Sequence, residues 1–289
     1  MSGHWIILPV LLPALTGALC LLALRERLAL ARIASTAATL LLLLTGIGLM
    51  RETGAEAYFL GDWPAPFGIV LVRDRLAALM VTLAALLALI AQCHAMASGE
   101  DARGRHFHAL WQFQLMGLNG AFLTGDAFNL FVFFEVLLIA SYGLMVHGGG
   151  AARLKAGVQY VVVNLVGSTL FLLALATVYS VTGTLNMADL AVKLPLLPEG
   201  DFALVRLAGA MLLAVFALKA ALVPLHVWLP ATYAEAPAPV AALFAVMTKV
   251  GVYAALRFLT LIFPETLPAT GGFFTTLLGG AAVLALLTG

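Results

Sequence analysis

The chain has 289 residues, of which 63% are hydrophobic and only 10% charged, and 15 lysines and arginines against 14 acids leave a formal net charge of +1. This composition is typical of helical membrane proteins that cross the bilayer many times. It argues against nucleic-acid binding, since no basic tail or soluble domain is present, and Cys20 and Cys93, both within apolar runs, indicate neither a disulfide framework nor a metal site.

Apolar runs of about the length that crosses a bilayer, roughly 20 residues, follow one another along the chain. They lie at about 5–24, 33–50, 76–98, 107–125, 127–147, 158–182, 204–224, 240–263 and 270–288. The first run is preceded only by Met1 to His4, without a basic segment, so we expect a retained span and not a cleaved signal peptide. The sequence therefore predicts an all-α, polytopic transmembrane bundle of about nine spans.

Basic residues gather in the loops after the first, third and fifth runs. They are Arg25, Arg27, Arg32, Arg103, Arg105, Arg153 and Lys155. The positive-inside rule places such loops in the cytoplasm. We therefore expect a multi-pass protein of the cell membrane with its N-terminus outside.

Two connections are long enough to carry local structure. Residues 51–75 contain Trp63, which is typical of a membrane interface, among turn-forming prolines and glycines, and we assign this segment no chemistry. Residues 183–201 favour a short interfacial helix that ends at Pro195. Asp126, between the fourth and fifth runs, can cap the helix that follows it.

The fifth run contains Glu135, about one third of the way along some twenty apolar neighbours. An isolated carboxylate at that depth takes up a proton unless a cation lies close to it. The eighth run contains Lys249 near its middle, beside Thr248. Both positions are costly for a charge, and ionisable residues inside a membrane are by default functional.

The seventh run contains Lys219 and then Pro224. A lysine at the centre of a membrane helix costs about 2.5–3.5 kcal/mol on insertion scales. Pro224 has no N–H, so it frees the carbonyl of Ala220 and predicts a helix break there. Unpaired backbone groups at this depth must face protein or a wet cavity. Together with His226, these residues indicate a path for protons or cations.

Each candidate also has a purely structural interpretation. Glu135 and Lys219 can form a buried ion pair that sets the register of two helices, and Lys249 can be a hydrogen-bonded packing residue. His226 can be an interfacial histidine that handles no proton. The two interpretations of the first pair share one expectation, that Glu135 and Lys219 face each other in the interior between their spans.

Three motifs together resemble the antiporter-like membrane subunits shared by respiratory complex I, membrane-bound hydrogenases and Mrp-type multisubunit Na⁺/H⁺ antiporters. They are GLNGAFLTGDAFNLFVFFEVLLIASYGLMV (117–146), ALKAALVPLHVWLPATYAEAPAPVAAL (217–243) and MTKVGVYAALR (247–257). Within that group, LTGDAFNLFVFFEVLLIASYGL and GTLNMADLA are most similar to the D subunits of the Mrp antiporters.

The resemblance implies a role for each motif residue in a proton or ion relay. Glu135 matches the glutamate of the family, Lys219 the lysine of the broken helix, Lys249 the linking lysine and His226 the histidine after the break. Family members have about fourteen spans built from two inverted five-helix repeats, a form common among transporters. In this chain, residues 1–106 would hold three leading helices and 107–263 the first repeat, with 264–289 as the start of a second repeat. A sequence that stops there indicates a fragment or a split subunit.

The leading hypothesis is therefore an ion-translocating subunit that exchanges H⁺ for Na⁺ or another monovalent cation, in a hetero-oligomer within the lipid bilayer. The alternative is a proton-pumping subunit of an NADH:quinone oxidoreductase or a related hydrogenase, and a third is a structural fragment that transports nothing. The sequence contains no recognisable quinone, flavin, iron–sulfur or nucleotide motif. We therefore expect no cofactor, no metal and no enzymatic redox chemistry in this chain.

Overall fold

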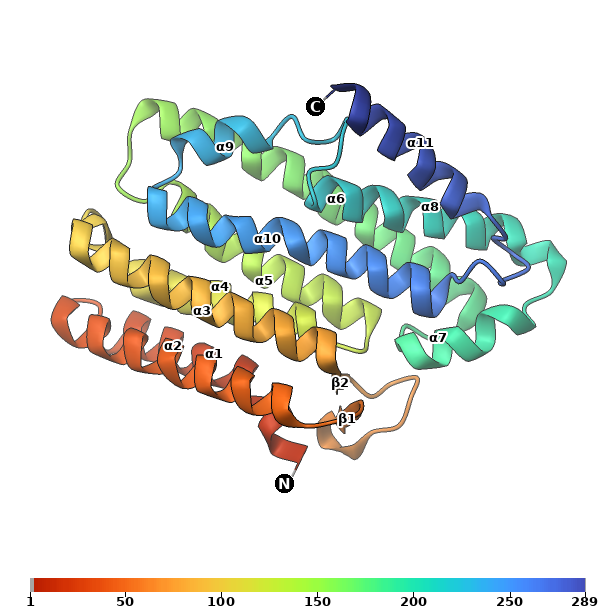
Figure 1. Ribbon diagram of the computed structural model, residues 1–289, viewed down its shortest axis with the longest axis horizontal. Helices are drawn as coiled ribbons and strands as arrows, with labels where there is room; N and C mark the ends of the chain where they lie inside the picture. Colours follow the sequence, from red (N-terminus) through yellow and green to blue (C-terminus); the bar gives the residue numbers. More distant parts are fainter. Residues whose placement is uncertain (1–2, 289) are drawn as a thin grey trace.

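Most of the chain is helical in the computed structural model, which describes residues 3–288 (Figure 1). The α-helices are α1 (Leu8–Leu22), α2 (Leu28–Arg51), α3 (Arg75–Ser98), α4 (Phe107–Leu123), α5 (Ala127–Met145), α6 (Ala151–Thr182), α7 (Met187–Lys193), α8 (Phe202–Lys219), α9 (Leu229–Glu235), α10 (Ala238–Arg257) and α11 (Phe273–Thr288). The strands are β1 (Glu56–Phe59) and β2 (Val70–Arg73). A π-helical segment, Phe258–Ile262, continues α10.

The long helices lie side by side, as expected of a membrane bundle (Figure 1). Within the described chain, 6 helices are long and apolar enough to cross a membrane: Leu28–Arg51, Arg75–Ser98, Ala127–Met145, Ala151–Thr182, Glu199–Lys219 and Ala238–Ile262. Leu8–Leu22 and Phe273–Val283 are shorter apolar helices. The predicted helical membrane bundle is confirmed at this level, whereas the count of nine spans stays a prediction.

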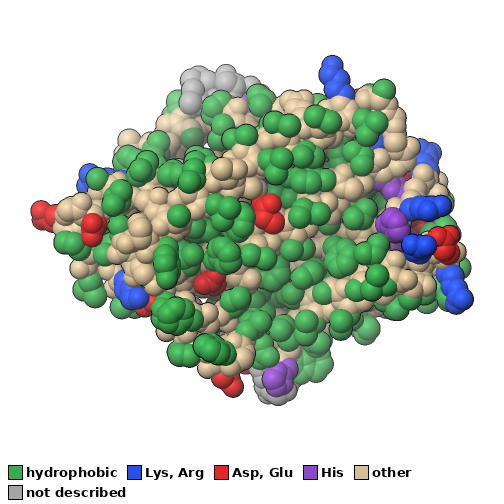
Figure 2. All heavy atoms as spheres, turned by 180° about the vertical axis from the view of Figure 1, so that it is seen from behind, with side chains coloured by type: hydrophobic (Ala, Val, Ile, Leu, Met, Phe, Trp, Pro, Cys, Tyr) green, Lys and Arg blue, Asp and Glu red, His purple; other side chains and the backbone are tan. Residues whose placement is uncertain are grey.

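The three basic loops lie at the same end of the bundle, on the left of Figure 1 and on the right of Figure 2. Side chains in these loops, and in the helix turns beside them, bind groups of the neighbouring loops. Arg32 donates two hydrogen bonds, of 2.6 and 2.8 Å, to the carboxylate of the buried Asp101. His147 lies 3.0 Å from the carbonyl of Glu100, and the guanidinium of Arg153 donates to the carbonyl of His147. The loops that the charge pattern grouped therefore form one connected cap.

Replacing Arg32 by alanine should destabilise this end by about 2 kcal/mol, because the carboxylate of Asp101 would stay buried without its guanidinium. Burial by itself raises the pKa of Asp101, but hydrogen bonds from Arg32 and His108 bring it below its ordinary value. The stabilisation is thus present at neutral pH and disappears as the pH falls through that lowered pKa. Unfolding in mixed micelles at several pH values measures this, with the exposed Arg27→Ala as control. Equal losses in the two variants would contradict it.

The connection 51–75 departs from the all-α prediction, because it folds into an antiparallel hairpin in which Glu56 pairs with Arg73. The Val-Leu-Val run of β2 suits a strand, since β-branched residues pack well on a pleated surface. Arg73 is 4% exposed and donates to the carbonyls of Glu52 and Gly54 and to the carboxylate of Glu56. The ends of the connection are therefore ordered, and its turn residues lie between them.

The predicted cap is confirmed, and a short helix forms where residues 183–201 favour one, whereas its interfacial position stays a prediction. Asp126 is the N-cap of α5, and its carboxylate accepts a hydrogen bond of 2.7 Å from the backbone N–H of Asn129. Burial raises the pKa of Asp126. The short helix α7 begins after its cap Asn186 and ends at Lys193, two residues before Pro195. Caps of this kind satisfy backbone donors that a helix leaves unpaired.

A fully buried polar network joins α2, α3 and α4. The amide of Gln112 donates to the hydroxyls of Ser35 and Thr39, and the amide of Gln92 donates to Ser35 and accepts from Thr39. All four side chains are 0% exposed. Such a network fixes the relative position of three helices, because breaking it would leave buried polar groups unpaired.

Candidate functional site

Lys219 is the last residue of α8 and lies inside the bundle, with 5% of its surface exposed. Its ammonium donates to the side-chain oxygen of Asn164 at 3.1 Å and lies 3.4 Å from the backbone carbonyl of the same residue. The ring of Phe134, on α5, lies 5.9 Å from the ammonium. A buried ammonium is therefore held by neutral groups of α6 and an aromatic face of α5.

Glu135 follows Phe134 on α5 and is half-buried. Its carboxylate accepts a hydrogen bond from the hydroxyl of Ser168, which also belongs to α6. Asn164 and Ser168 are four residues apart, so they lie on the same face of that helix. One face of α6 therefore holds both the acid and the base.

The sequence predicts that Glu135 and Lys219 face each other as a pair. Within the described residues they are not hydrogen-bonded to each other, although they are close enough to interact electrostatically. The physical reason is that Asn164 and Ser168 give each charge its own neutral partner. The pair is therefore indirect, and α6 connects its members.

The helix break lies where the proline predicts it. α8 ends at Lys219, residues 220–228 form turns, and α9 begins at Leu229. Pro224 lies in these turns, and no hydrogen bond reaches the Ala220 carbonyl from the described part of the chain. The Leu218 carbonyl accepts from the backbone N–H of Ala221, at 3.1 Å, and from the indole N–H of Trp228, at 3.0 Å. The freed backbone is thus next to the buried Lys219, and Ala220 itself is half-buried.

His226 lies in the same broken segment and is half-buried. Its Nδ1 is buried and has no hydrogen-bond partner among the described residues. A buried unpaired ring nitrogen is costly, so it favours a site that a water molecule or a proton carrier completes. The structure brings His226 and Lys219 to the two ends of one short irregular segment.

Lys249 lies apart from the other charges. It is exposed on α10, and its ammonium lies 3.3 Å from the hydroxyl of the adjacent Thr248. Two residues later, Gly251 meets the break directly, since a Cβ added there would lie 2.5 Å from the backbone nitrogen of Ala220 and 2.9 Å from the carbonyl carbon of Lys219. The backbone of α10 therefore touches the broken helix although the side chain of Lys249 does not.

Asn164 and Ser168 were not identified from the sequence, and neither was the tyrosine one turn before them. Tyr160 is 0% exposed, and its hydroxyl lies 2.7 Å from that of Ser141 on α5. The signal was present, because polar residues recur every fourth position at 160, 164 and 168 within an apolar run. That spacing places all three on one helix face, which lipid would not favour.

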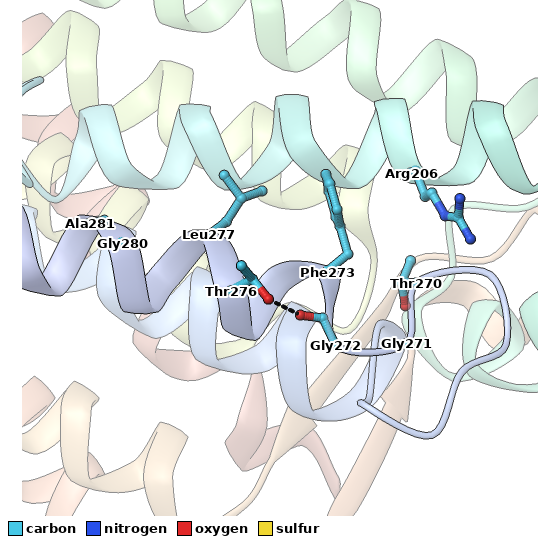
Figure 3. Close-up of a pocket in the computed structure, with 9 residues that line it drawn as sticks. All are labelled: Arg206, Thr270, Gly271, Gly272, Phe273, Thr276, Leu277, Gly280 and Ala281. Carbon is cyan, nitrogen blue, oxygen red and sulfur yellow. Dashed lines mark hydrogen bonds between the residues drawn. The ribbon is translucent and has the colours of Figure 1, made fainter.

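A separate hollow of about 860 Å³ lies between α8 and α11, away from this site. Figure 3 shows Phe273 and Leu277 of α11 directed toward α8, with Arg206 at one end. Arg206 donates to the carbonyl of Ala269, so its charge is already engaged. Among the described residues no cluster of histidine, cysteine and acidic side chains could hold a metal ion.

The chain is similar in sequence to several known proteins. The family model described as NADH:quinone oxidoreductase/Mrp antiporter, TM, matches residues 124–289. The probable D subunit of a K(+)/H(+) antiporter from Rhizobium meliloti is 48% identical over 98% of this chain and 56% of its own length. The D subunit of a Na(+)/H(+) antiporter from Bacillus subtilis is 44% identical over 90% of this chain and 53% of its own.

The chain is also similar to a chain in a solved structure. The Mrp complex from Dietzia sp. DQ12-45-1b contains a chain that is 34% identical, with a TM-score of 0.81 over 91% of this chain and 50% of that one. The present chain thus spans about half the length of the curated relatives it matches, 56% and 53%.

Proposed function

Because the chain belongs to the NADH:quinone oxidoreductase/Mrp antiporter transmembrane family, we propose that it is an ion-translocating part of a multisubunit antiporter that exchanges H⁺ for a monovalent cation. The similarity to two D subunits, one of a K(+)/H(+) and one of a Na(+)/H(+) antiporter, supports this assignment over a redox-driven pump. The two relatives differ in the cation, so we propose the exchange for the class of monovalent cations and not for Na⁺ alone.

The observation that carries the proposal is the environment of Lys219. Its ammonium is buried at the broken end of a membrane helix and is held by the neutral Asn164. Lysine, unlike arginine, can lose its proton in a buried site. Glu135, on α5, interacts electrostatically with this lysine, and the hydrogen bond from Ser168 sets the position of the Glu135 carboxylate. The arrangement supports a lysine whose charge changes while its neighbours stay in place.

The relay has an entrance and an exit in this proposal. A proton arrives near His226, in the broken segment, and reaches Lys219, and the change of charge there alters its interaction with Glu135. The exposed Lys249 then receives the charge. The close contact of Gly251 with the break supports this order, because a movement of the Lys219 backbone would displace α10 directly.

We further propose the larger architecture that the family resemblance implies. Residues 107–263 would be the first of two inverted repeats, after three leading helices in 1–106 and before a second repeat that starts within 264–289. Counting α1, α4 and α11 with the six long helices would make nine spans in the cell membrane, with the N-terminus outside. The other half of the path and the other subunits would complete the antiporter.

Exchanging Glu135 for glutamine tests the proposal. Glutamine keeps the hydrogen bond from Ser168 and removes the charge that acts on Lys219, so proton flux should fall by about tenfold and its pH optimum should shift, with little change in assembly. The measurement is cation-driven proton flux in inverted vesicles, normalised to assembled complex.

Glu199→Gln, an exposed acid before α8, is the matched control and should transport like wild type. An unchanged pH profile in Glu135→Gln would contradict the relay. Proton flux that requires quinone reduction but no counter-cation would instead favour a redox-driven pump.

A further inference from the structure

A groove of about 450 Å³ opens where α2 meets the hairpin, away from the relay. It is lined by Trp5, Ile6, Leu41, Leu44, Thr45, Gly48, Leu49, Glu52, Glu56 and Arg73. Leu41 and Leu44 are 52% and 55% exposed, so this part of the groove opens on the outer surface of a helix long enough to cross the membrane. The groove is therefore accessible from the lipid phase.

The groove changes from apolar to acidic along one helix face. Leu41, Leu44, Gly48 and Glu52 are spaced by three or four residues, which places them in one row along α2. The row runs for about 16 Å at the rise of an α-helix. Leucines form its inner end and a carboxylate its outer end, where Trp5 also lies, and tryptophan favours the membrane–water interface. A phospholipid has the same order of polarity along the membrane normal.

The charges at the outer end select the headgroup. Arg73 is buried and pairs with Glu56 at 3.1 Å, so these two charges compensate each other. Glu52 is exposed and has no ionic partner among residues 3–288. Among the charged residues that line the groove, one negative charge is thus left over, which attracts an ammonium group and repels a headgroup with a net negative charge. The Nε of Arg73 also lacks a hydrogen-bond partner within the described chain.

We propose that this groove binds one zwitterionic phospholipid of the ethanolamine type. Its ammonium lies at Glu52, its ester oxygens lie beside the Arg73 guanidinium, and one acyl chain follows Leu44 and Leu41 inward. The notch at Gly48 makes room for that chain, because a Cβ added there would meet no atom within 4 Å. The bound lipid would hold the hairpin against the end of α2.

Filling the notch tests the site without disturbing the packing of the helix. Gly48→Phe occupies open space, so the chain should fold, and the retained phospholipid should fall by about tenfold as its acyl chain loses room. Ile33→Phe, on the same helix, 66% exposed and outside the groove, is the control and should retain the lipid. The probe is native mass spectrometry of the full chain with its bound subunits, stripped of lipid and titrated with phosphatidylethanolamine or phosphatidylglycerol.

Glu52→Gln separates headgroup recognition from acyl-chain binding. Wild type should prefer phosphatidylethanolamine by about fivefold, and the variant should lose most of that preference while still binding both lipids. Equal affinity of wild type for the two lipids, or unchanged retention in Gly48→Phe, would overturn the proposal. A map of the purified complex with a protein side chain in the groove would also overturn it.

Discussion

Lys219→Ala should abolish cation-driven proton flux, leaving less than about one hundredth of the wild-type rate at equal assembly. The alanine removes the one buried ammonium that Asn164 holds next to the helix break. Without it, Glu135 keeps its hydrogen bond from Ser168 but loses the cation with which it interacts. Flux in inverted vesicles, normalised to complex on a blue-native gel, is the measurement.

Lys219→Arg separates the charge from its ability to change. Arginine keeps a permanent positive charge and so should assemble normally and still transport poorly. Lys155→Ala, at an exposed position near the start of α6, is the matched control and should leave flux unchanged. Wild-type flux in Lys219→Ala at equal assembly would show that this lysine is structural, and the proposed relay would be wrong.

Gly251→Ala should lower flux by about tenfold or more although it adds a single carbon atom. That Cβ would lie 2.5 Å from the backbone nitrogen of Ala220 and 2.8 Å from the Phe216 carbonyl oxygen, and backbone atoms cannot rotate away. α10 must therefore shift from the break, and a displacement of about 1 Å near a reacting group can cost a hundredfold in rate. Flux and thermal stability of the purified complex measure the two effects.

Gly279→Ala is the control for this change, because it lies in α11 and its added Cβ would meet no atom within 4 Å. Both substitutions favour the helix by about 1 kcal/mol, so helix propensity alone would stabilise both variants. Loss of flux and stability only in Gly251→Ala is the expected pattern. A Gly251→Ala protein that is more stable than wild type and fully active would contradict the close contact with the break.

Much of the candidate site could be predicted because a charge in an apolar run is conspicuous. Glu135, Lys219 and Lys249 each interrupt such a run, and the cost of a charge in a membrane marks them without any structure. The break near Pro224 follows from a missing N–H, which is a property of one residue. The common end of the basic loops follows from counting spans, since alternate loops of a helical bundle lie on the same side.

The partners of those charges could not be predicted from the same signals. Asn164 and Ser168 are neutral and cost little free energy in a helix, so composition does not identify them as site residues. Only their spacing with Tyr160 does. The exposure of Lys249 depends on the rotation of α10, which the contact of Gly251 with the break sets. The hairpin at 56–73 depends on two short segments that pair across a turn, and neither is long enough to predict alone.

By itself, then, the sequence determined the class of fold, the three charged residues within apolar runs and the interruption of α8, because each depends on local hydropathy or backbone chemistry. Only the tertiary structure decided that Lys219 and Glu135 meet through Asn164 and Ser168, that Lys249 lies outside this group, and that α10 touches the break. These outcomes depend on how helices far apart in the chain rotate and approach, and side-chain packing between them sets that geometry.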